Sequence, residues 1–81
     1  MNYKYKIRLD TLTEVNEFVN LATRIDGRII LTDGRNFSVN ARSMLGALYS
    51  LEWDELYVES EEEIYTVMQK FIIWFFQKFM L

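Results

Sequence analysis

The chain contains no histidine and no cysteine. Without cysteine it has no disulfide, no thiol nucleophile and no thiolate ligand for zinc. Without histidine it has no imidazole to transfer protons, bind a metal or carry a phosphate. We therefore expect a protein that is not an enzyme and has no metal or cofactor. The lack of disulfides is typical of a cytoplasmic protein.

Proline is also absent, and only three glycines occur. No linker or low-complexity segment is visible, so we expect a single domain over residues 1–81. The nine basic residues do not cluster and the net charge is −3, which argues against nucleic-acid binding. Lys4, Lys6 and Arg8 interrupt the first apolar run, so no signal segment is expected, and no apolar run is long enough for a transmembrane segment.

The apolar residues that are present follow the periods of strands and helices. Alternation predicts strands over 3–9, 28–32, 36–40 and 55–59, with Asp33-Gly34 as a hairpin turn. Capping boxes at Thr11–Glu14 and Ser60–Glu63 predict a first helix with an apolar stripe to Ile25 and a last helix running nearly to Leu81. Ser43 is expected to cap a short helix over 44–50. The predicted fold is α+β in the order β-α-β-β-α-β-α, an open-faced sandwich with a four-stranded antiparallel sheet and three helices on one face.

Residues 39–51 read V-N-A-R-S-M-L-G-A-L-Y-S-L. This segment resembles the K-S-I-M-G-V-M-S-L region of HPr, the histidine-containing phosphocarrier of the bacterial sugar phosphotransferase system. HPr has the same order of elements, so the resemblance extends over roughly residues 3–73. It implies an HPr-like fold for the whole domain.

The catalytic motif of HPr, G-x-H-A-R-P, falls on residues 9–14, which read L-D-T-L-T-E here. Thr11 takes the position of the phosphorylated histidine and Thr13 that of the arginine. Neither threonine replaces its counterpart, and Glu14 adds a charge that repels phosphate. The resemblance is therefore to a divergent family member that cannot act as a phosphocarrier.

Ser43 matches the serine at which HPr undergoes regulatory phosphorylation. A helix N-terminus favours an added phosphate, but a plain helix cap would equally account for a serine there. The apolar residues that follow match the surface through which HPr meets its partners; they are Met44, Leu45, Ala47 and Leu48. Core packing is the alternative explanation for these residues, because so short a helix must bury some of them.

The end of the chain, F-I-I-W-F-F-Q-K-F-M-L, is not explained by the resemblance. Its apolar residues would surround a helix, and one buried stripe cannot accommodate them all. The candidates for a homodimer or partner contact are Ile72, Ile73, Phe76 and Met80. An overfilled core and membrane association are the second and third interpretations.

The leading hypothesis is a cytoplasmic regulatory domain that binds proteins, those of the phosphotransferase system among them, and is regulated at Ser43. A structural or oligomerisation module that uses the last helix is the first alternative. A ferredoxin-like domain that senses a small molecule is the second alternative. The acidic residues near the two ends of the last predicted strand match no calcium-binding loop, so no metal site is expected.

Overall fold

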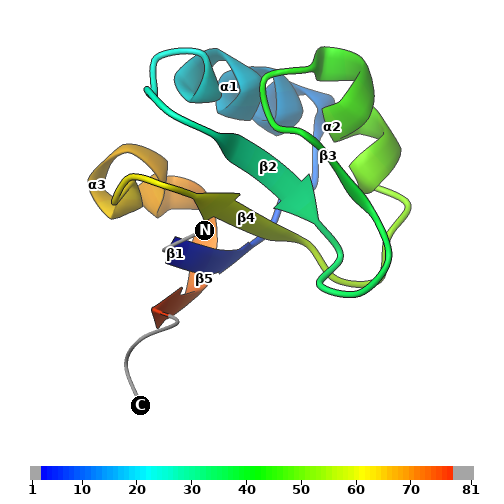
Figure 1. The fold of residues 1–81 in the computed structure, drawn as a ribbon. Coiled ribbons are helices and arrows are strands. Elements are labelled where there is room, and N and C mark those ends of the chain that lie inside the picture. The colour runs from blue at the N-terminus through cyan, green and yellow to red at the C-terminus, as the bar shows by residue number, and fades with distance from the viewer. Residues whose placement is uncertain (1–2, 78–81) are drawn as a thin grey trace.

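The computed structural model describes residues 3–77, with side chains described as far as Ile73. The elements along the chain are β1 (Tyr3–Ile7), α1 (Leu12–Ala22), β2 (Ile29–Thr32), β3 (Ser38–Asn40), α2 (Met44–Ser50), β4 (Tyr57–Ser60), α3 (Tyr65–Met68), a 3-10 turn (Gln69–Phe71) and β5 (Ile72–Gln77). The fold is α+β, with an open antiparallel sheet of five strands and three helices (Figure 1).

The strands are arranged in the order β3-β2-β4-β1-β5, and each neighbouring pair is antiparallel. The period of two in β1 determines which side chains are buried. Tyr5 lies opposite Val58 of β4, and both are fully buried. Lys4 lies opposite Glu59 on the other face of the sheet, where the two charges are complementary.

The buried face of the sheet packs against all three helices in one cluster of apolar side chains. Val15 and Phe18 of α1 lie at its centre, and Phe18 meets Phe71 edge to face with ring centroids 5.7 Å apart. Figure 1 shows α1 and α2 side by side, and α1 also contacts α3. In the part of the chain that the structure describes, all three helices pack on the face that carries Tyr5, and none packs on the face that carries Lys4 and Lys6.

The predicted last helix is wrong. α3 ends at Met68, and after the 3-10 turn the chain returns as β5, which pairs with the free edge of β1. Residues 72–76 are β-branched or aromatic, and such residues favour a strand wherever a sheet edge is available. The sheet therefore has five strands rather than the predicted four.

The second predicted capping box is also wrong. Ser60 is fully buried at the end of β4, and its hydroxyl donates to the carbonyl oxygen of Glu62. The residue that precedes α3 is Ile64, which has no side-chain cap. Glu63 instead accepts a hydrogen bond from the backbone N–H of Tyr65 at 2.8 Å.

The first capping box is confirmed in full. Thr11 Oγ1 accepts from the N–H of Glu14 at 3.1 Å, and Glu14 Oε1 accepts from the N–H of Thr11 at 3.2 Å. α1 ends at Ala22, earlier than the predicted stripe, and Ile25 is buried from the loop that follows. Gly34 has a φ of 83°, as expected at the predicted hairpin turn.

Candidate interaction site

α2 carries several large apolar side chains that are exposed to solvent. Ser43 caps the start of α2, and its Oγ accepts a hydrogen bond from the N–H of Gly46 at 3.1 Å. Ala47 and Ser50 on one side of the helix are buried against the core. The opposite side carries Leu45, which is 80% exposed, and Tyr49, which is 55% exposed. A short helix thus keeps a complete apolar face outside the core.

Two aromatic rings from elsewhere in the chain extend this face. Trp53 meets Tyr49 edge to face, with centroids 6.1 Å apart. Phe37, from the loop between β2 and β3, stacks on Trp53 with centroids 6.0 Å apart and an angle of 16° between the rings. We refer to the whole surface as the α2 patch; its members are Phe37, Leu45, Leu48, Tyr49 and Trp53. Four of the nine large apolar side chains that are exposed in the described residues belong to it.

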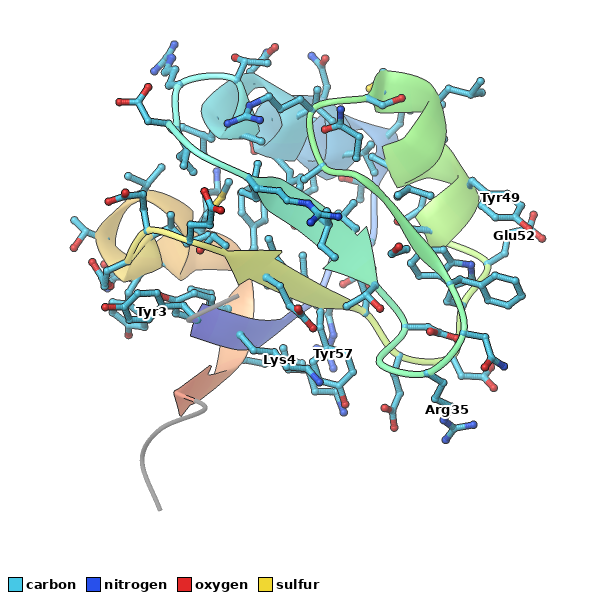
Figure 2. All side chains as sticks on the ribbon, in the orientation of Figure 1. Tyr3, Lys4, Arg35, Tyr49, Glu52 and Tyr57 are labelled. Carbon is cyan, nitrogen blue, oxygen red and sulfur yellow. The ribbon has the colours of Figure 1, made fainter. Side chains whose placement is uncertain are left out.

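A shallow hollow of about 210 Å³ lies at the end of the α2 patch, between the β2–β3 loop and the segment after α2. Phe37 and Trp53 form its apolar wall. Its remaining lining is charged and consists of Asp33, Arg35, Glu52, Asp54 and Glu55. Figure 2 shows Tyr49 and Glu52 close together at the α2 side of the molecule, with Arg35 at the tip of the loop below them.

Two of the carboxylates in the hollow are held in the charged form by hydrogen bonds. The backbone N–H groups of Phe37, Arg35 and Asn36 donate to Asp33 Oδ1 and hold the pKa of that carboxyl below its usual value. The hydroxyl of Tyr57 donates to Glu55 Oε1 at 2.7 Å. This hydrogen bond, with the nearby charge of Lys6, lowers the pKa of the Glu55 carboxyl.

Arg42, immediately before the Ser43 cap, has a structural role that sequence reasoning missed. Its Nε donates to the carbonyl oxygen of Ala22 at 3.0 Å. Its Nη2 donates to the carbonyl oxygens of Ile25 and, at 2.7 Å, of Gly27. The last turn of α1 contains no basic residue that could donate to its free carbonyl oxygens. This feature of the sequence could have indicated that a donor comes from another part of the chain.

The residues predicted to bind a partner do not all reach the surface. Leu45 and Leu48 are exposed, Met44 is half-buried against the core, and Ala47 is fully buried and offers no surface. Phe37, Tyr49 and Trp53 are not among the predicted site residues. Their aromatic character was visible, but only the folded chain brings them together.

The remaining predicted site residues lie apart from the α2 patch. Thr11 is exposed at the start of α1, where it serves as the cap. Ile72 and Ile73 lie on β5 rather than on a helix; Ile72 packs partly against the core and Ile73 is 45% exposed. The backbone of Phe76 pairs with Lys4, and Met80 lies outside the described residues.

Over residues 3–77, no helix has the length and apolar character needed to cross a membrane. No group of three or more acidic side chains in the same part of the chain is arranged to hold a metal ion. Comparison with protein-family models, with curated proteins and with solved structures gives no significant match.

Proposed function

We propose that this protein is a cytoplasmic, non-catalytic interaction domain similar to HPr, which binds a protein partner through the α2 patch. The observation that carries the proposal is the exposed apolar face of α2, with Leu45 and Tyr49 more than half exposed. Leaving such side chains in water forfeits about 1.5–3 kcal/mol each relative to burial. Exposed apolar surface gathered on one element commonly marks a binding site.

The test is to compare the proteins that associate with the wild type and with a Leu45→Asp/Leu48→Asp variant. The matched control is Leu12→Asp/Val67→Asp, which places the same charges at exposed apolar positions of α1 and α3. We expect at least one partner to be retained by the control and lost from the α2 variant. If the α2 variant keeps every partner of the wild type, the proposal is wrong.

Regulation at Ser43 is part of the same proposal. Ser43 is half-buried at the start of α2, and no acidic residue in the first turn of that helix would repel a phosphate. A phosphate there would interact favourably with the free N–H groups and the dipole of the helix. It would also lie one residue from the half-buried Met44 and two residues from Leu45, so it would change the charge of the patch.

The test of regulation is intact-mass analysis after incubation with ATP and an HPr-type serine kinase. Ser43→Asn is the best control, because asparagine caps a helix as well as serine does but cannot be phosphorylated in this way. We expect one phosphate on the wild type and none on Ser43→Asn. A phosphate retained by Ser43→Asn, or none on the wild type, would contradict regulation at this residue and leave it as a helix cap.

Self-association through β5 is a second candidate function. It replaces the predicted self-association through a last helix, because residues 72–77 form a strand. β5 is an edge strand, and its six residues carry neither charge nor proline. The opposite edge, β3, has three residues, two of them polar. Protein sheets usually protect long apolar edges, and an unprotected one can pair with a second copy.

We expect light scattering to give the mass of a dimer for the wild type and of a monomer for Ile73→Lys. A monomeric wild type would contradict assembly through β5.

A further inference from the structure

The α2 patch ends in a strongly acidic rim. Glu52 lies three residues after Tyr49 and seven after Leu45, so it continues the exposed stripe of α2 into the segment that follows (Figure 2). Asp54 is exposed beside it, and Asp33 and Glu55 complete the rim from the β2–β3 loop and the approach to β4. The apolar and acidic surfaces therefore adjoin.

Among the described residues, Arg35 is the one basic residue that lines the hollow with these four carboxylates, and together the five side chains carry a formal charge of −3. Asp33 and Glu55 are held by hydrogen bonds, and Lys6 lies near Glu55. The other two carboxylates of the hollow, Glu52 and Asp54, make no hydrogen bond or ion pair with the rest of the described chain, and both residues are exposed. These two are therefore available to a partner.

The charge of the rim distinguishes between occupants of the patch. A second copy placed symmetrically would set each acidic rim against either the rim or the apolar face of the other copy, and both contacts are unfavourable. Anionic lipid surfaces and nucleic acids would be repelled for the same reason. A segment with apolar residues flanked by basic ones would satisfy the patch and the rim at once.

We propose that the partner of the α2 patch is a protein segment in which apolar or aromatic anchors are flanked by lysine or arginine. This inference rests on the proposed function, since it specifies the chemistry of the partner for the same surface. The apolar anchors contact Leu45, Leu48 and Tyr49, and the basic residues pair with Glu52 and Asp54. Arg35 lies in the same hollow as these carboxylates and competes with the incoming cations.

The first experiment selects binders from a random twelve-residue peptide library displayed on phage. We expect the enriched peptides to combine leucine or aromatic residues with an excess of lysine and arginine, and to bind the Leu45→Asp/Leu48→Asp variant weakly. Enriched peptides that need Leu45 and Leu48 but show no basic excess would overturn the charge inference and leave the proposed function standing. If no selected peptide depends on Leu45 and Leu48, both proposals are wrong.

The second experiment measures the binding of one selected peptide to charge variants of the whole domain. We expect Glu52→Lys/Asp54→Lys to weaken binding roughly ten-fold, mainly through slower association, and to reduce its salt dependence. Asp26→Lys/Glu62→Lys is the matched control, because it makes the same change of net charge at exposed positions outside the hollow. We expect Arg35→Gln to strengthen binding. If both double variants lose the same amount of binding affinity, the effect comes from the net charge of the domain and not from Glu52 and Asp54. That result would overturn the inference.

Discussion

Replacing Arg42 by alanine is expected to destabilise the domain more than any other single change of an arginine in the described residues. The guanidinium donates hydrogen bonds to the carbonyl of Ala22, at the end of α1, and to two carbonyls of the loop that follows, so it joins this region to the segment that precedes α2. A hydrogen bond to a charged group contributes about 1.5–3 kcal/mol, and such contributions are not additive. The bonds to Ala22 and Ile25 are partly buried, whereas water can replace the donor at the exposed Gly27. The expected loss in the free energy of unfolding is therefore about 2–3 kcal/mol.

The assay is urea unfolding followed by tryptophan fluorescence. For a domain of this size the same loss lowers Tm by roughly 10–20 °C. Arg42→Lys keeps the charge but not the planar fork of donors, so we expect it to recover part of the loss. Arg24→Ala is the control, because Arg24 is exposed and its side chain makes no hydrogen bond or ion pair in the part of the chain that the structure describes. A loss below about 0.5 kcal/mol for Arg42→Ala, which is the range of ordinary surface substitutions, would refute the reasoning.

Three further predictions concern single residues. Thr11→Ala should lower the free energy of unfolding by about 1 kcal/mol because the capping box is lost, whereas Thr11→Ser should leave it unchanged. If urea unfolding gives the same loss for both variants, the hydroxyl has no role. Gly27→Ala should lower the free energy of unfolding by about 1–2 kcal/mol in the same assay, because φ of Gly27 is +81° and a Cβ there would lie 2.8 Å from Glu61 Oε1. An unchanged midpoint of unfolding would contradict this conformation of the loop. The pKa of the Asp33 carboxyl is lower in the folded protein than its ordinary value of 3.8. The ionised carboxylate therefore stabilises the fold fully when the pH is above 3.8. This stabilisation is lost as the pH falls from 3.8 through the lower pKa of the folded state. Asp33→Asn should therefore be less stable at neutral pH and lose less stability on acidification; parallel pH profiles of urea unfolding would contradict this.

Local sequence predicted those features whose causes lie within a few residues. Thr11 and Glu14 satisfy each other's backbone groups at the start of α1, so the capping box could be recognised from a four-residue pattern. Ser43 caps α2 for the same local reason. The alternation in β1 was sufficient to predict that Tyr5 and Ile7 are buried and that Lys4 and Lys6 face the other side.

The end of the chain could not be predicted in this way. A continuous apolar run fits a buried helix and a strand equally well by periodicity. Its structure depends on whether a sheet edge is available, and the free edge of β1 is known only from the folded arrangement. The acidic residues after Ser60 also resemble the start of a helix, but Ser60 is buried in β4 and unavailable as a cap.

The amino-acid sequence by itself determined that this protein has no imidazole and no thiol. It also determined a capped first helix and a short apolar helix with Ser43 as its cap. The tertiary structure alone decided which apolar residues remain outside the core. It buries Ala47, exposes Leu45, and brings Phe37 onto Trp53 from a loop more than ten residues away. It also places Arg42 against the end of α1 and four carboxylates around one hollow. These contacts join segments distant along the chain, and local preferences carry no information about such pairings.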